Sequence, residues 1–185
     1  MIDEFLQDAR EHMDKSVDAT RQKFQSVRTG RASPALLDRI SVDYYGAVTP
    51  LRQLSTISAS EARLLTVQPY DKSSIKAIER AIMESDLGLT PNNDGSIIRL
   101  QIPELTEERR KQLVKVVRGL TEEGKVALRN IRRDVMHDLK ELRDAGEAGA
   151  DDEHRAEEAL QKLTDDKVKE LDALLKGKEA EILEV

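Results

Sequence analysis

The 185-residue chain contains no cysteine and no tryptophan, and aromatic side chains make up only 3% of it. The absence of cysteine excludes disulfide frameworks, cysteine-ligated zinc, iron–sulfur clusters and thiol nucleophiles. No run approaches the roughly 18 consecutive apolar residues of a membrane span. The start of the chain, from Met1 to Phe5, lacks the basic and apolar segments of a signal peptide. The sequence therefore predicts a soluble, cytoplasmic protein that does not engage a membrane.

Charged residues, by contrast, make up 36% of the chain, against about 25% in a typical domain. Such a composition favours long helices bathed in solvent over a thick aromatic core. The formal net charge is −6 at pH 7, and this value taken alone argues against a nucleic-acid partner.

Three segments show the apolar spacing of three and four residues that is typical of an amphipathic helix. The first begins near Ile2 and is expected to end at Gly30, because glycine readily adopts the left-handed conformation that closes a helix. The second is expected to run from an N-cap at Thr106 to about Arg143, a length of roughly 57 Å. The third begins near Asp151. Three narrow apolar stripes bury each other most economically in a three-helix bundle.

Between the first two helices the apolar period changes to the alternation of strands. Residues 40–45, 63–68 and 98–102 are predicted to form strands, and residues 75–82 a short helix. The expected fold is therefore α+β with two domains. Residues 1–30 and 105–185 form the bundle, and residues 31–104 form a small α+β domain, a β/α/β sandwich, inserted between helices one and two.

Two connectors join the predicted domains. One contains Gly30 and Arg31, and the other contains Glu104, Leu105 and Thr106. Two short connectors of this kind can act as a hinge.

The charge is unevenly distributed, since residues 106–143 carry +4 and residues 144–185 carry −8. At about 100° per residue, several cations of the second helix fall within roughly 40° of one line along it. These residues are Lys111, Arg118, Lys125, Arg129 and Arg132, with Lys115 and Arg133 beside them. The line predicts a cationic face that binds RNA phosphate, for which the planar guanidinium of arginine is suited.

A simpler interpretation is that these cations pair with the acids of the third helix, as most charge runs do. Both interpretations remain open at the level of sequence. The scarcity of aromatic residues disfavours stacking on bases, so an RNA partner would be bound through its backbone and shape.

No pattern indicates an active site. Residues 119–126 resemble a phosphate-binding loop, but Val126 stands where a Ser or Thr should contact magnesium, and no strand precedes them. We expect Gly124 instead to allow two helices to approach closely. The acidic run at residues 151–154 suits the positive end of a helix better than a metal ion. We therefore expect no catalytic residue, no metal site and no cofactor.

Several longer segments resemble the bacterial ribosome recycling factor family, and the resemblance runs from end to end. They are RTGRASP at residues 28–34, YYG at 44–46, TPLRQL at 49–54, SDLGL at 85–89, LTEERRK at 105–111 and VALRNIRRD at 126–134. The resemblance implies an L-shaped protein whose bundle is one arm and whose small domain is the other. It also implies a monomeric translation factor that binds the post-termination 70S ribosome and, with elongation factor G and GTP, splits it into subunits.

The resemblance extends to individual residues. In the family, the bundle lies against large-subunit ribosomal RNA near the peptidyl-transferase region, and Arg129, Arg132 and Arg133 match the arginines of its second helix. Arg110 lies in another matching motif, and Arg28 and Arg31 flank the hinge glycine. Together with Arg118 and Lys125 of the cationic face, these are the expected RNA-binding residues. Two other classes remain as alternatives: a scaffold that binds proteins through the acidic third helix, and a hydrolase.

Overall fold

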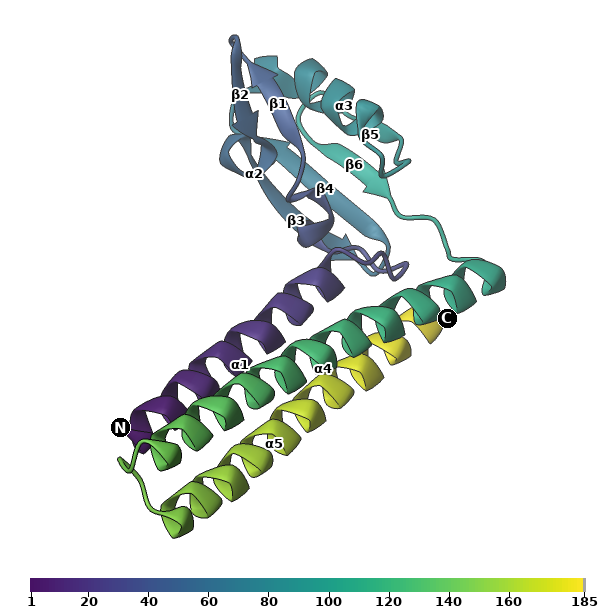
Figure 1. Ribbon diagram of the computed structural model, residues 1–185. Helices are drawn as coiled ribbons and strands as arrows, with labels where there is room; N and C mark the ends of the chain where they lie inside the picture. Colours follow the sequence, from purple (N-terminus) through teal and green to yellow (C-terminus); the bar gives the residue numbers. More distant parts are fainter. Residues whose placement is uncertain (185) are drawn as a thin grey trace. The chain divides into compact units, whose positions relative to one another are not determined.

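A computed structural model describes residues 1–184, which fold as two compact units (Figure 1). One unit contains Met1–Val27 together with the chain from Lys111 onward, and the other contains Arg28–Arg110. The expected fold class is confirmed, because a small α+β unit is inserted into the sequence of a helical one. The units divide at residues 27/28 and 110/111, whereas divisions at 30/31 and 104/105 were expected from the sequence.

The first unit is a three-helix bundle. Its helices are α1 (Ile2–Gln25), α4 (Glu107–Asp144) and α5 (Ala150–Leu183), which run side by side in Figure 1. Their apolar stripes bury one narrow core between them, because residues three and four apart share a helix face. The buried residues of this core are Ala9, Met13, Val17, Leu128, Leu139, Ala156, Leu160, Leu163 and Leu171.

Helix α4 starts where the sequence predicted, whereas α1 ends before the predicted residue. The Thr106 hydroxyl accepts a hydrogen bond from the backbone N–H of Arg109 at 3.1 Å, which is the expected N-cap. Helix α1, however, ends at Gln25, and the Ser26 hydroxyl donates to a carbonyl of the last turn. Gly30 has the positive φ of 79° that was expected of it, but it lies in the connector, beyond the helix end.

Gly124 has the role that its position predicted. A Cβ atom at this residue would lie 2.6 Å from the Thr20 hydroxyl oxygen of α1 and 3.1 Å from a methyl group of Leu171 of α5. Both distances are too short for ordinary contact. The glycine therefore lets all three helices pack closely at this level.

The second unit contains two antiparallel sheets. Strands β1 (Ser41–Tyr44) and β2 (Ala47–Pro50) form a hairpin. The larger sheet has the order β3-β4-β6-β5, from strands β3 (Ser55–Glu61), β4 (Leu64–Pro69), β6 (Ile98–Gln101) and β5 (Pro91–Asn93). The unit also contains helices α2 (Leu51–Leu54) and α3 (Ile75–Glu84), and 3₁₀ turns at Pro34–Leu37 and Lys72–Ser74.

The core of this unit is aliphatic. Helix α3 contributes Ile75, Ile78 and Ile82, which pack with buried residues from the hairpin and from the two central strands of the sheet. These strand residues are Val42, Leu65, Val67, Ile98 and Leu100.

The sequence did not predict the two edge strands. Strand β3 consists mostly of small polar residues, because most of its side chains face solvent. Strand β5 begins with Pro91, which occupies the first position of an edge strand, where the ladder tolerates proline. Edge strands bury too little surface to show an apolar alternation.

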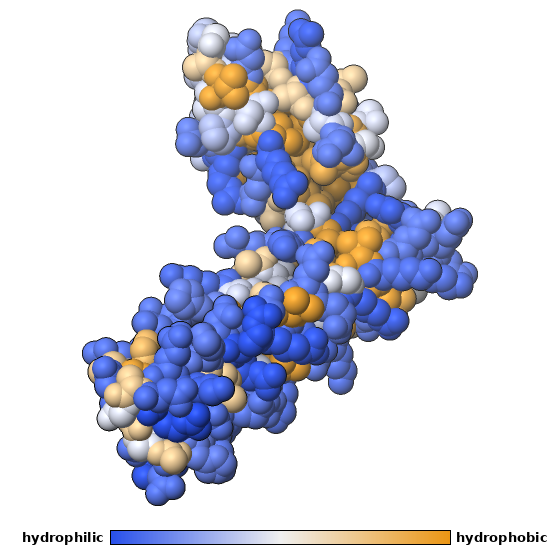
Figure 2. Space-filling view, in the orientation of Figure 1, coloured by the Kyte–Doolittle hydropathy of each residue, from blue (hydrophilic) through white to orange (hydrophobic). Residues whose placement is uncertain are grey.

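Hydrophilic residues cover most of the visible surface of the bundle, with only scattered apolar patches (Figure 2). None of the helices in residues 1–184 combines the length and the apolar character needed to cross a membrane.

Candidate nucleic-acid interface

The predicted cationic line on α4 lies partly against α5. Arg118 Nε donates to Glu179 Oε1 at 2.6 Å, and Lys125 Nζ lies 2.7 Å from Asp172 Oδ1. The side chain of Lys125 is only 16% exposed, and its hydrogen bond to Asp172 raises the pKa of the ammonium group above its usual value. These two cations thus pair with acids of the third helix, as the simpler interpretation predicted, and the RNA contact expected of them remains a prediction.

Arg132 also contacts α5, but through a neutral group. Its guanidinium donates to the amide oxygen of Gln161. Its Nε is buried and has no hydrogen-bond partner among residues 1–184. The charge of Arg132 is therefore not neutralised by a direct ion pair within that part of the chain.

Arg129 and Arg133, which lie near Arg132 on α4, are exposed. Arg133 is 72% exposed, and its only ion pair within the described residues is a 3.4 Å contact with its neighbour Asp134. The side chain of Arg129 is exposed and has no hydrogen bond or ion pair with another residue of the described chain. Arg129, Arg132 and Arg133, in the second half of α4, thus form no ion pair with an acid of α5 among the described residues and can meet an external anion.

The other three expected RNA-binding residues belong to the second unit. Arg28 and Arg110 are half-buried, and the Nε of each is buried without a hydrogen-bond partner among the described residues. Arg31 is exposed. The RNA contact expected of these three residues remains a prediction.

The two connectors meet within the second unit. A Cβ atom at Gly30 would lie 3.4 Å from Cγ of Leu105, so the connectors pass each other closely at this glycine. Arg63 pairs with Glu104 at 2.6 Å, and the backbone N–H of Ala32 donates to the Ala62 carbonyl at 2.7 Å. Both connectors are thereby tied to the segment that joins β3 to β4.

The motifs that resembled an active site have other roles. Residues 119–126 lie within α4 and form no loop that could surround a phosphate. In the acidic run, Glu153 pairs with Arg143 of α4 at 2.9 Å, and His154 pairs with Glu158 at 3.3 Å. No group of three or more His, Asp or Glu side chains in residues 1–184 has the arrangement of a metal site.

The chain is similar to known proteins over its whole length. A family model described as "Ribosome recycling factor" matches residues 20–183. The chain belongs to the ribosome recycling factor family. The ribosome-recycling factor of Rubrobacter xylanophilus is 56% identical over 180 residues, which are 97% of each chain. That of Halalkalibacterium halodurans is 56% identical over 185 residues and the full length of both.

Solved structures agree with this assignment. A solution structure of the ribosome recycling factor is 40% identical, with a TM-score of 0.79 over 100% of this chain and 98% of that one. The T. thermophilus ribosome recycling factor, from models with E. coli elongation factor G bound to the E. coli post-termination complex, is 46% identical. Its TM-score is 0.69, over 99% of both chains. The resemblance that the sequence motifs indicated is confirmed.

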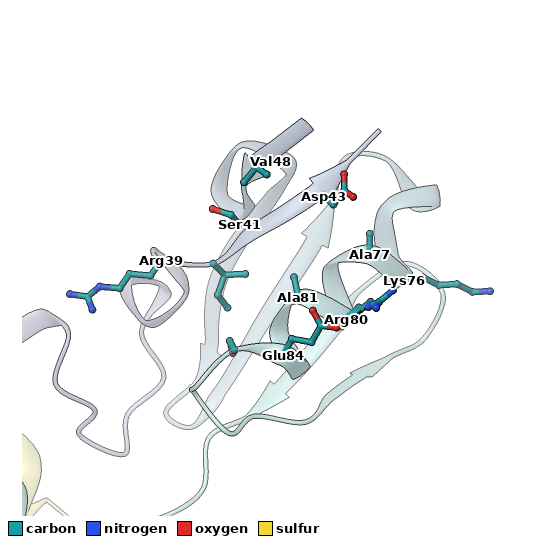
Figure 3. A pocket seen from close by; sticks show the side chains of 11 residues that line it. Arg39, Ser41, Asp43, Val48, Lys76, Ala77, Arg80, Ala81 and Glu84 are labelled. Carbon is teal, nitrogen blue, oxygen red and sulfur yellow. Dashed lines mark hydrogen bonds and ion pairs between the residues drawn. The ribbon is translucent and has the colours of Figure 1, made fainter. Parts of the chain in front are cut away.

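Two features of this recycling-factor fold were not found from the sequence. One is a groove of about 800 Å³ between the β1–β2 hairpin and α3 (Figure 3). Val48, Ala77 and Ala81 lie along it, and Arg80 pairs with Glu84 at 2.9 Å. A groove formed by segments more than twenty residues apart leaves no local pattern in the sequence.

The other feature is a tyrosine cluster at the tip of the hairpin. Tyr44 donates to Asp71 at 3.0 Å, and the Tyr45 hydroxyl lies 3.2 Å from that of Ser73. Hydrogen bonds from Ser73 are the main cause of the lowered pKa of Asp71, and the bond to Asp71 raises the pKa of Tyr44. Tyr45 has a φ of 49°, next to Gly46, so the sequence signal for this tight turn was the YYG motif itself.

Proposed function

We propose that this chain binds the post-termination ribosome and, together with elongation factor G and GTP, splits it into subunits. The full-length match to the ribosome recycling factor family supports this function most strongly. In this role the protein works as a monomer in the cytoplasm and has no active site of its own. The nucleotide chemistry belongs to the elongation factor.

The proposed contact with large-subunit ribosomal RNA, near the peptidyl-transferase region, is made by the cations at residues 129–133, in the second half of α4. Arg129, Arg132 and Arg133 support it, because they lie close together on one helix and form no ion pair with an acid of α5 among the described residues. Guanidinium groups bind phosphate oxygens bidentately. Arg118 and Lys125 extend the same line, and Arg28, Arg31 and Arg110 add contacts from the second unit.

This proposal predicts that the double variant R129A/R132A binds vacant 70S ribosomes at least tenfold more weakly than the wild type. If each arginine neutralises one phosphate, the slope of log affinity against log salt falls by about two units. Co-sedimentation over a series of salt concentrations measures both quantities. The variant R80A/R99A removes the same charge from the small domain and serves as the control. Equal losses in the two variants, or an unchanged slope in R129A/R132A, would contradict the assignment.

We further propose that the small domain moves about the connectors during splitting. The residues involved are Gly30, Arg31, Glu104, Leu105 and Thr106. Gly30 supports this role, because its positive φ and its close approach to Leu105 suit a position where two chain segments must pass each other.

A disulfide between the connectors tests this motion. The natural chain has no cysteine, so two introduced cysteines, one in each connector, can pair only with each other. We expect the oxidised protein to bind 70S ribosomes but to split them several-fold more slowly with elongation factor G and GTP, as followed by light scattering. Reduction of the same sample should restore the rate. Full splitting activity in the oxidised form would show that no such motion is needed.

A further inference from the structure

The contacts between α4 and α5 form a regular ladder. Three cations of α4 are spaced seven residues apart, and three acids of α5 are spaced seven residues apart in the opposite direction. A step of seven residues advances each helix by about 10.5 Å, so the positions of an antiparallel pair stay in register. Two facing pairs are in contact, Arg118 with Glu179 and Lys125 with Asp172, and the same register of seven residues places Arg132 opposite Asp165.

The first two pairs are closed by direct contact. The carboxylates of Glu179 and Asp172 lie 2.6 Å and 2.7 Å from their cations. A carboxylate accepts the same charge-assisted hydrogen bonds that a phosphate oxygen accepts. An RNA phosphate that approaches Arg118 or Lys125 must therefore compete with the carboxylate already paired with that cation.

The third pair is interrupted by Gln161. Its amide oxygen accepts from Arg132, and its amide nitrogen donates to Asp165 at 2.9 Å. A neutral amide thus takes the place that a carboxylate takes in the first two pairs. Arg132 keeps its charge unpaired within the described residues, one turn from the unpartnered Arg129.

We propose that Asp172 and Glu179 compete with RNA phosphate for Lys125 and Arg118, and that Gln161 keeps Arg132 available. This inference rests on the proposed function, in which α4 contacts ribosomal RNA. The two acids restrict the affinity of α4 for arbitrary RNA, because two cations of its line are already paired. An RNA surface shaped to reach residues 129–133 of α4 then binds best. The α5 acids are specificity-determining residues for this contact.

The variant Gln161→Glu places a carboxylate beside Arg132 with almost no change in side-chain size. We expect its affinity for vacant 70S ribosomes to fall about five- to tenfold and its salt slope to fall by about one unit. The control is Gln22→Glu, which adds the same charge at an exposed position of α1. An affinity equal to that of the control would overturn the role of Gln161.

The double variant D172N/E179Q should have the opposite effect on arbitrary RNA. The probe is a 20-base-pair RNA duplex without ribosomal sequence, and binding is measured by fluorescence anisotropy over a salt series. We expect an affinity gain of about tenfold and a slope steeper by about two units, because two cations are released. The control is E158Q/D166N, which removes the same charge from exposed positions of α5. Among the described residues, Glu158 pairs only with His154.

The affinities of D172N/E179Q and E158Q/D166N for the duplex are compared with that of the wild type. No gain in D172N/E179Q would show that the acids do not compete with RNA, and the same gain in E158Q/D166N would show that they act only through net charge. Either result would overturn the proposal. Far-ultraviolet circular dichroism checks that both double variants keep their helices. Failure of the wild type to co-sediment with ribosomes would contradict the proposed function instead, and the duplex comparison would still report on the ladder.

Discussion

The bundle and the small domain are stabilised by different kinds of contact. Where two helices of the bundle meet, some cations are largely buried. The side chains of Lys125 and Lys167 are only 16% and 15% exposed. Each of them pairs with a carboxylate of another helix. In the small domain, the pairs Arg63–Glu104 and Arg99–Asp94 leave every side chain at least 43% exposed. There, a dense cluster of Leu, Ile and Val side chains holds the fold.

This difference shows how one short chain can combine a charged binding surface with a stable fold. A narrow apolar stripe leaves most of the surface of each long helix free to carry charged side chains. Ion pairs between neighbouring helices then determine which of these side chains have no partner within the bundle. The small domain instead has a close-packed aliphatic core, in which a change of side-chain volume is costly. The two units should therefore respond differently to core mutations, to steric changes and to pH.

The units can be followed separately in one sample. All three tyrosines, Tyr44, Tyr45 and Tyr70, lie in the small domain, and the chain has no tryptophan. Near-ultraviolet tyrosine signals therefore report mainly on the small domain. The three long helices of the bundle dominate the far-ultraviolet circular dichroism.

The largest expected effect is a cavity in the aliphatic core. Ile98 of β6 is fully buried, so Ile98→Ala should lower the free energy of unfolding of the small domain by about 2–5 kcal/mol. Denaturant titration followed by the tyrosine signal measures this loss. The helical signal should change much less. A parallel loss of both signals would show that the two units unfold as one.

The helices and the central strands could be predicted from the sequence because their patterns are local. Residues 98–102 alternate strictly, and β6 was observed at Ile98–Gln101. The end of α1 could not be placed, because Gly30 offered a better stop signal than Ser26, which actually caps the helix. Strand β3 was missed because an edge strand with an exposed face needs no apolar alternation.

The candidate site could be predicted only in part. Helical periodicity gathered the cations of α4 on one line, but it could not tell which of them face α5. Lys125 and Arg129 differ by four residues and look equivalent in sequence, yet one is paired with Asp172 and the other is exposed. The register between α4 and α5 decides this, and register is a property of the packed bundle.

A smaller effect is expected where the helices of the bundle approach most closely. In Gly124→Ala, the new methyl group meets Thr20 and Leu171, and repacking should cost about 1–3 kcal/mol. Better helix propensity recovers up to about 1 kcal/mol of this. Gly119→Ala is the matched control on the same helix, because a Cβ atom there meets no other atom within 4 Å. Thermal unfolding should show destabilisation in the first variant and slight stabilisation in the second; the same sign in both would contradict the close packing at Gly124.

The smallest expected effect is a dependence of small-domain stability on acid. Asp94 accepts hydrogen bonds from the backbone N–H of Ile97 and of Ser96 and from Arg99, and these bonds lower the pKa of Asp94 to about 2. A carboxyl whose pKa is lowered by folding stabilises the fold above its unfolded pKa of 3.8, and this stabilisation is lost as the pH falls towards 2. Asp94→Asn should therefore weaken the small domain at neutral pH, and its difference from the wild type should shrink between about pH 4 and pH 2. Tyrosine-detected unfolding at a series of pH values measures this difference. If it stayed constant down to pH 2, the bonds to Asp94 would not depend on its charge, and the small domain would owe its stability to its aliphatic core alone.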